Sequence, residues 1–307
     1  MSGSLRLDPT MPLRRLAWGA AFALACLPAA LACLSAPAQA GPITIVAAES
    51  VYGDVAAQIG GAEVNVTSIM SAPGQDPHQF EPSPSAARAI AAAKLVIANG
   101  ANYDPWIEKL LAATRSQRSV IVVADLVKAK PGDDPHLWYA PATMPIVATR
   151  IADELAARDP AHKEAYAQRL KTFIDSLAPI AARIRAIEAK HAQTPVTATE
   201  PVFGYMTKAL GFAMRNERFQ RAVMNGTEPS ASDVAAMQDD LKGGKVKILF
   251  HNSQVSDDLT GRLRAVATAH NVPVVAVTET KPADKSYQAW VAAELDAVVK
   301  ALDGGGS

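Results

Sequence analysis

The sequence predicts an α/β protein with two lobes, each with a mostly parallel sheet flanked by helices, joined by one long backbone helix. Two blocks of short apolar strands alternate with helical segments, a pattern typical of parallel sheets covered on both faces. Between the blocks, residues 161–192 carry one apolar stripe with steps of four and three, which is the period of an α-helix. The length of 307 residues is sufficient for two domains.

Residues 1–40 have the layout of a secretory signal peptide. Arg14 and Arg15 precede an apolar stretch rich in Ala and Leu, which ends in the small residues Ala38 and Ala40. A positive start, an apolar stretch and a small-residue cleavage site define such a leader. We therefore expect cleavage after Ala40 and export to the bacterial periplasm. An uncleaved membrane anchor is the alternative, because the apolar run approaches the length of a membrane span.

Both cysteines of the chain, Cys26 and Cys33, lie inside this leader. A mature chain that starts at Gly41 then has neither a disulfide nor a cysteine metal site. A lipid anchor on Cys33 is a second alternative, but the residues before it, Ala30–Ala32, fit a lipobox only weakly.

The first lobe is expected to cover residues 41–160. Predicted strands cover 43–47, 64–69, 94–100 and 119–126, and predicted helices cover 51–59, 83–93 and 104–114. Gly60 and Gly61 end the first helix. Ser83 or Ser85 caps the second, and Pro84 suits its first turn.

Residues 161–192 are expected to form the linking helix. Its stripe consists of Tyr166, Leu170, Phe173, Leu177, Ile180, Ile184 and Ile187. A helix of this length spans roughly 48 Å at about 1.5 Å per residue, enough to run along both lobes. Pro179 should bend it, because proline removes one helical hydrogen bond. A coiled-coil dimer seam is the competing interpretation of the stripe, but we expect a monomer.

The second lobe, residues 193–307, repeats the alternation. Predicted strands cover 195–199, 245–250 and 272–278, and predicted helices cover 202–211, 230–244, 259–270 and 286–303. The whole chain has 30 basic and 30 acidic residues without a run of like charge. We therefore expect no nucleic-acid partner.

Four polar residues follow predicted strands, where open parallel sheets bind their ligands. His78 and His136 each follow a proline in an Asp-Pro-His turn of the first lobe, and Glu200 and Glu279 follow strands of the second. Two imidazoles and two carboxylates make a plausible site for one divalent cation. His251 competes for the fourth position.

The fixed backbone of the prolines should pre-order both histidines for an ion. Asp76 and Asp134 are candidates to accept the second ring N–H of each imidazole. The remaining histidines, His162, His191 and His270, fall in helical or helix-end segments and are expected at the surface.

With these motifs the chain resembles the metal-binding receptors of bacterial ABC importers for zinc and manganese, the ZnuA/TroA-like family of cluster A-I. The resembling segments are DPHQFEPSPS (76–85), IANGANYDPWIEKL (97–110), DDPHLWYAP (133–141), EPVFGYMTKALG (200–211) and VTET (277–280). The resemblance implies two lobes joined by a backbone helix, with one ion between them. It places the ligands at His78, His136, Glu200 and Glu279.

The resemblance further implies a periplasmic solute-binding protein that carries Zn²⁺ or Mn²⁺ to a membrane permease and, through it, to an ATPase. The ion remains open between the two. Zinc receptors of the family often have His at the position of Glu200, and manganese receptors more often have Asp at that of Glu279.

The alternative function is a secreted metalloenzyme, such as a metal-dependent hydrolase. An enzyme needs an open coordination position and a general base, whereas four protein ligands close the site, and the sequence has no HExxH motif. We therefore expect no enzymatic activity. Because imidazole ligands must be deprotonated, we expect metal affinity to fall as pH drops through about 6.5.

Overall fold

The computed structural model describes residues 1–3, 41–72, 80–114, 117–130, 132–255 and 257–304. Most of the predicted signal peptide and the segment 73–79, where we predict the turn that carries His78, lie outside these described residues. Residues Pro42–Ser307 form one compact unit. In the described part of the chain, no helix is both long and apolar enough to cross a membrane.

The first sheet has four parallel strands in the order β2-β1-β3-β4. They are β1 (Ile43–Glu49), β2 (Val64–Met70), β3 (Leu95–Ala98) and β4 (Ser119–Val122). Strand β1 lies inside the sheet and is buried from Ile45 to Glu49, as expected for a parallel strand covered on both faces. Since the strands are parallel, their C-terminal ends meet at one edge, where polar residues gather.

Helices surround this sheet and complete the first lobe. They are α1 (Ser50–Gly60), η1 (Gly61–Glu63), α2 (Pro84–Ala92), α3 (Pro105–Ala113), α4 (Val123–Val127), η3 (Leu137–Tyr139) and α5 (Thr143–Arg158). Two of the predicted helix ends are confirmed. Ser83 caps α2 by accepting a hydrogen bond from the Ala86 N–H, and Gly61 follows α1 with a positive φ of 61°, which favours glycine.

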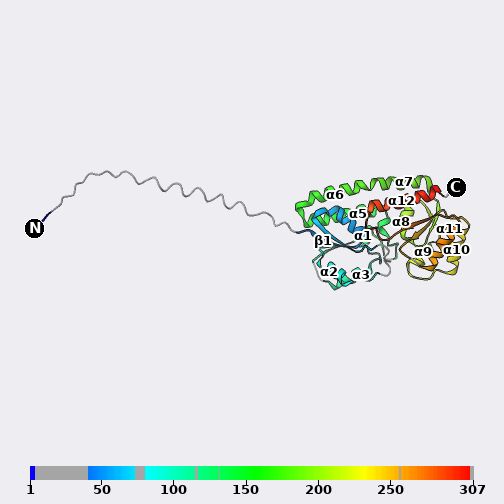
Figure 1. Cartoon of the computed structure of the whole chain (residues 1–307), viewed down its shortest axis with the longest axis horizontal. Helices are drawn as coiled ribbons and strands as arrows, with labels where there is room; N and C mark the ends of the chain where they lie inside the picture. Colours follow the sequence, from blue (N-terminus) through cyan, green and yellow to red (C-terminus); the bar gives the residue numbers. More distant parts are fainter. Residues whose placement is uncertain (4–40, 73–79, 115–116, 131, 256, 305–307) are drawn as a thin grey trace. The chain divides into compact units, whose positions relative to one another are not determined.

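The predicted linking helix consists of a short turn and two helices laid end to end (Figure 1). These are η4 (Pro160–His162), α6 (Lys163–Ser176) and α7 (Ala178–His191), and Leu177 separates α6 from α7. Pro179 is the second residue of α7. Because its ring nitrogen cannot donate to the preceding turn, the helix breaks where we predicted a bend.

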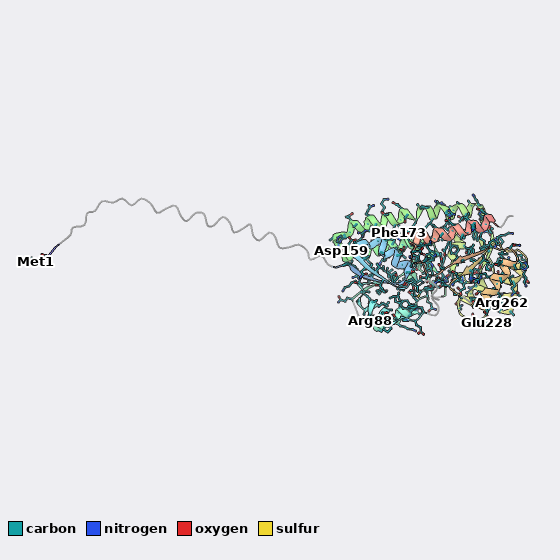
Figure 2. The ribbon with its side chains drawn as sticks, in the orientation of Figure 1. Met1, Arg88, Asp159, Phe173, Glu228 and Arg262 are labelled. Carbon is teal, nitrogen blue, oxygen red and sulfur yellow. The ribbon has the colours of Figure 1, made fainter. Side chains whose placement is uncertain are left out.

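The apolar stripe of this linker packs against the chain's own lobes. Tyr166, Phe173, Ile184 and Ile187 are buried in the main core, and the other members of the stripe are partly buried against it. Figure 2 shows Phe173 on this pair of helices. The stripe is therefore covered within the molecule, which argues against the coiled-coil interpretation.

The second sheet also has four parallel strands, in the order β6-β5-β7-β8. They are β5 (Pro195–Ala198), β6 (Ala213–Met214), β7 (Leu249–Asn252) and β8 (Val274–Val277). Its helices are η5 (Pro201–Phe203), α8 (Gly204–Ala209), α9 (Glu217–Met224), α10 (Ala231–Lys242), α11 (Asp258–Ala269) and α12 (Tyr287–Gly304). The predicted α/β architecture with two lobes and a helical connection is confirmed.

One continuous core contains residues of both sheets. Ile45 and Ile97 from the first sheet and Phe250 from the second belong to the same buried cluster, together with Trp138 of η3. The last helix, α12, contributes Trp290 to this cluster and runs beside α7 (Figure 1). A smaller cluster under α9, α10 and α11 completes the second lobe.

Some predicted elements differ from the structure. The predicted strand 119–126 ends at Val122, and the chain turns into α4, where the Ala124 N–H donates to the Asn99 carbonyl. The predicted strand 245–250 is shifted, because β7 covers Leu249–Asn252. Helices α5 and α9 were not predicted.

Candidate metal centre

His136 lies at the centre of the group of polar residues that the two sheets bring together. It precedes η3, is fully buried, and its ring Nδ1 lies 2.6 Å from Oδ1 of Asp134. The same oxygen accepts the His136 backbone N–H at 3.0 Å. Asp134 therefore orients the imidazole, as predicted, and leaves Nε2 to face the second lobe.

Glu279 meets that imidazole from the second lobe. Its Oε2 lies 3.3 Å from His136 Nε2 and accepts a hydrogen bond from the Tyr103 hydroxyl at 2.9 Å. The turn that carries it follows β8 and is fixed by Gln254, whose Oε1 accepts the backbone N–H groups of Glu279 and Thr280 at 2.6 and 2.7 Å. The Glu279 side chain is therefore held from both lobes.

Glu200 follows β5 of the same sheet and is also buried. The Asn252 side-chain amide, at the end of β7, donates to Glu200 Oε2 at 2.6 Å and to Glu279 Oε1 at 2.7 Å. One amide thus joins the two predicted carboxylate ligands. Asn252 is the last residue of β7, which pairs with β5. It therefore lies at the C-terminal edge of the sheet, where parallel strands place their ligand-binding residues.

The structure therefore brings together three of the four predicted site residues, His136, Glu200 and Glu279. The fourth, His78, lies outside the described residues. Among the residues that are described, no group of three or more His, Cys, Asp or Glu side chains has the geometry to hold a metal ion.

His251, the competitor for the fourth position, lies away from these residues. Side chains alternate along a strand, so His251 and Asn252 of β7 point to opposite faces. His251 Nε2 lies 3.2 Å from Arg264 Nη1 on α11. Burial, followed by the charge of Arg264, lowers the pKa of His251. In this arrangement Glu279, and not His251, faces His136 and Glu200.

Two opposing effects set the protonation of His136. Burial lowers the pKa of this imidazole, but the charge and hydrogen bond of Asp134 and the contact with Glu279 outweigh it and raise the pKa to about 10. At neutral pH both ring nitrogens thus carry protons in this arrangement, Nδ1–H toward Asp134 and Nε2–H toward Glu279. A cation that binds at Nε2 must displace that proton.

Further tyrosines connect the two lobes around the site. The Tyr139 hydroxyl lies 2.6 Å from the Thr278 carbonyl oxygen and 2.8 Å from Oε1 of Glu294, and these two acceptors share its one proton. From the second lobe, Tyr205 donates to the Asp134 carbonyl at 2.9 Å, and Tyr287 donates to the Trp138 carbonyl at 3.0 Å. These bonds fix the backbone before and after the candidate ligands, which favours a pre-ordered site.

The sequence reasoning missed Tyr103, Asn252 and Gln254. Asn252 directly follows His251 at the end of a strand, the same kind of position that singled out Glu200 and Glu279. That position is the signal that could have found it. The role of Tyr103 depends on a contact with Glu279, which is 176 residues away in the sequence, and no local pattern reports such a contact.

Comparisons with known proteins define the class. Residues 45–301 match a family model described as "Zinc-uptake complex component A periplasmic". The chain belongs to this family of metal-transport components. Several relatives are named as substrate-binding lipoproteins of metal ABC transporters, which agrees with the expectation of no enzymatic activity.

Curated relatives carry different metals in their names. The chain is 26% identical over 284 residues to the manganese ABC transporter substrate-binding lipoprotein PsaA of Streptococcus pneumoniae, covering 85% of this chain and 89% of the relative. It is 26% identical over 224 residues to the iron-binding protein YfeA of Yersinia pestis, covering 69% and 70% of the two chains.

Solved structures share the fold. The periplasmic zinc binding protein TroA from Treponema pallidum superposes with a TM-score of 0.73 at 19% identity, over 85% of this chain and 99% of TroA. A Cd-bound periplasmic metal binding protein from Candidatus Liberibacter asiaticus gives a TM-score of 0.68 at 21% identity, over the same shares of the two chains. These similarities confirm the two-lobed α/β fold.

Proposed function

We propose that this protein captures one divalent metal ion, Zn²⁺ or Mn²⁺, between its lobes and delivers it to the permease of an ABC transporter. The proposed ligands are His78 and His136 of the first lobe and Glu200 and Glu279 of the second. One observation carries the proposal. A buried imidazole of one lobe faces a buried carboxylate of the other at 3.3 Å, and an amide links that carboxylate to a second one.

The charges of the described residues favour a cation at this place. Glu200 and Glu279 are both buried and share the Asn252 amide. Two carboxylates held this close repel each other, and the repulsion is stronger in the interior than in water. A divalent cation between them would attract both carboxylates, and its two positive charges would balance their two negative charges.

Donor chemistry leaves Zn²⁺ and Mn²⁺ both acceptable. Imidazole nitrogen suits zinc, and carboxylate oxygen suits manganese. A mixed site of this kind binds zinc more tightly on intrinsic affinity, so the transported ion also depends on which metal is available. The relatives named for manganese, iron and zinc support a divalent transition metal as the class of cargo.

We place this metal capture in the periplasm, after removal of residues 1–40 as a signal peptide. The two lobes are residues 41–160 and 193–307, and the linker is residues 161–192. The partners are the cognate permease and its ATPase, and the chain acts as a monomer. Several relatives are named lipoproteins. The intact mass of the exported protein distinguishes cleavage after Ala40 from lipidation at Cys33, since a lipidated chain would be heavier.

The test combines elemental analysis of the purified mature protein with competitive Zn²⁺ and Mn²⁺ titration. We expect about one ion per chain, and a loss of binding in the variant with His78→Ala and Glu200→Ala. His270→Ala is the matched control, because His270 is exposed at the end of α11. Equal binding by the double variant and the wild type would show that the proposed site is wrong.

A further inference from the structure

The turn after β3 has an unusual backbone. Gly100, Ala101 and Asn102 all have positive φ angles, of 74°, 51° and 65°. For residues with a side chain, this left-handed conformation costs roughly 1–2 kcal/mol each. The carboxylate of Asp104 compensates by accepting the backbone N–H groups of Asn99 and Gly100, at 2.7 and 2.8 Å. Strained backbone that is held in this way is common at functional sites.

The same turn is tied to the segment before His136. The Asn99 side-chain amide donates to the Pro135 carbonyl at 2.9 Å, and its oxygen accepts the Tyr52 hydroxyl at 2.5 Å. Asn99 is fully buried. The turn 99–104 and the turn that carries His136 therefore form one rigid unit at the sheet edge.

Tyr103 projects from this unit toward two of the candidate ligands, His136 and Glu279. Its ring lies edge-on to His136, with 5.9 Å between centroids, and edge-on to Trp138 at 5.1 Å. Its hydroxyl crosses to the second lobe and donates to Glu279 Oε2 at 2.9 Å. Since 8% of Tyr103 is exposed, water competes little for this bond.

The phenol is suited to act only as a donor. The Tyr103 hydroxyl has one proton to donate, and its acceptor is Oε2 of Glu279 at 2.9 Å. The geometry therefore directs this proton at the carboxylate. A hydrogen bond to a charged group contributes more to orientation than one between neutral groups.

We propose that Tyr103 is a positioning residue for metal capture, which holds the Glu279 carboxylate of the second lobe at the angle required by an ion on His136 of the first. The inference rests on the proposed function. Groups that orient metal ligands typically affect metal affinity 10- to 100-fold when they are removed. Tyr103 belongs to the turn 99–104 of the first lobe. The first lobe therefore determines the orientation of Glu279, a ligand that belongs to the second lobe.

The test uses Tyr103→Phe in the mature protein, because it removes the hydroxyl and keeps the ring. Tyr166→Phe is the matched control, since Tyr166 of α6 is also buried and also donates to a carboxylate, Asp159 at 2.8 Å, but has no bond to a candidate ligand or its turn. Zn²⁺ affinity is measured by competition with a chelator. Bound Co²⁺ is measured by its visible absorption, which reports the geometry of its ligands.

We expect Tyr103→Phe to bind Zn²⁺ about 10- to 100-fold more weakly and to change the Co²⁺ absorption band, whereas Tyr166→Phe keeps the wild-type affinity and band. An affinity within twofold of wild type, or a weaker affinity with an unchanged band, would overturn the role of Tyr103 alone. A wild-type protein that binds neither Zn²⁺ nor Mn²⁺ would instead overturn the proposed function, and this inference with it.

Discussion

The Asn252 side-chain nitrogen lies 2.6 Å from Oε2 of Glu200, which follows the neighbouring strand β5 of the same sheet. The same nitrogen lies 2.7 Å from Oε1 of Glu279. Both N–H groups of one amide are therefore used on two carboxylates. All three side chains are buried, so these bonds and the repulsion between the carboxylates are stronger than in water. Asn252 is the group that keeps two like charges side by side.

Replacing that amide by a carboxyl group of the same shape should destabilise the protein. For Asn252→Asp, we expect the free energy of unfolding at pH 7.5 to fall by about 2–3 kcal/mol without metal, since hydrogen bonds to charged groups are lost. The loss should shrink at pH 5, because the introduced carboxyl group can then be protonated and donate. Urea denaturation at both pH values measures the difference.

The matched control for this substitution is Asn65→Asp on β2, where Asn65 is exposed. It makes the same chemical change and should alter stability by less than about 0.5 kcal/mol. A similar loss in both variants would mean that the added charge alone, and not the broken link between Glu200 and Glu279, is responsible.

Metal binding should depend on pH through His136. The pKa of this imidazole is raised to about 10, because Asp134 and Glu279 outweigh the effect of burial. Without metal, the stabilisation from its protonated form is complete below about pH 6.5 and is lost as the pH rises through about 10. An ion at Nε2 displaces the proton, so its affinity should rise about tenfold per pH unit between pH 6.5 and 8.5.

Competitive titration with Mn²⁺ at pH 6.5, 7.5 and 8.5 measures this slope. Asp134→Asn removes the nearest carboxylate and should flatten the dependence above pH 7.5. The sequence alone suggested that metal affinity changes near pH 6.5. The two carboxylates beside His136 raise its pKa and so extend this change to higher pH. An affinity that stays constant from pH 6.5 to 8.5 would contradict the displacement of a proton from His136.

The parts of the fold that followed from the sequence are those set by local patterns. The apolar run 43–47 predicted a strand, since strands of parallel sheets are covered on both faces, and Ser83 caps its helix by a local hydrogen bond. Helix α5 was missed although Met144, Val147, Ile151 and Leu155 are buried along it with helical spacing. That miss was avoidable.

Strand ends were less predictable because they depend on the partner strand. Val122 and Val123 both favour strands, yet β4 stops at Val122, which is opposite Ala98, the last residue of β3. Beyond that point the Ala124 N–H bonds to the carbonyl of Asn99 in the turn. Tertiary contacts thus override the propensity of a β-branched run.

In the candidate site, too, residues recognisable from local patterns differ from residues that depend on tertiary contacts. Histidines and carboxylates after strands could be recognised from their residue types, and three of them, His136, Glu200 and Glu279, do meet. Tyr103 could not be recognised, since it acts on Glu279, 176 residues away in the sequence. Asn252 had a local signal, its position at the end of a strand. To identify Asn252, the position of β7 must also be known. The predicted strand ended at residue 250 and β7 ends at Asn252, and this shift of two residues changes which side chains reach the sheet edge.

Removing the charge of Glu294 should stabilise the protein at alkaline pH. Burial raises the pKa of this carboxyl group on α12 to about 8, although hydrogen bonds from Tyr139, Thr278 and Trp290 lower it in part. The unfolded chain loses the proton near pH 4.5 and the folded chain near pH 8. The free energy of unfolding therefore decreases between these values, by at most about 5 kcal/mol.

Glu294→Gln cannot ionise, so it should exceed the wild type in stability at pH 8.5 and lose this advantage at pH 4.5. Thermal unfolding across this range measures the difference between the two proteins. Glu228→Gln is the control, because Glu228 is exposed on the second lobe (Figure 2). If Glu294→Gln and wild type keep parallel profiles over the whole range, the carboxyl group titrates normally.

The linker should contribute to folding as part of the shared core. Phe173 of α6 is 2% exposed and belongs to the cluster that contains residues of both sheets. We expect Phe173→Ala to cost about 3–5 kcal/mol, because truncation of a buried phenylalanine leaves a cavity. The neighbouring Ile174→Ala is the control and should cost far less, since Ile174 is 36% exposed.

Urea denaturation followed by tryptophan fluorescence tests this prediction, because Trp138 belongs to the first lobe and Trp290 to the second. If the common core couples the lobes, Phe173→Ala should shift a single transition to lower urea concentration. Two separate transitions, with only one of them shifted, would mean that the lobes unfold independently. In that case the linker would stabilise one lobe only, and the shared cluster would contribute little to the coupling between them.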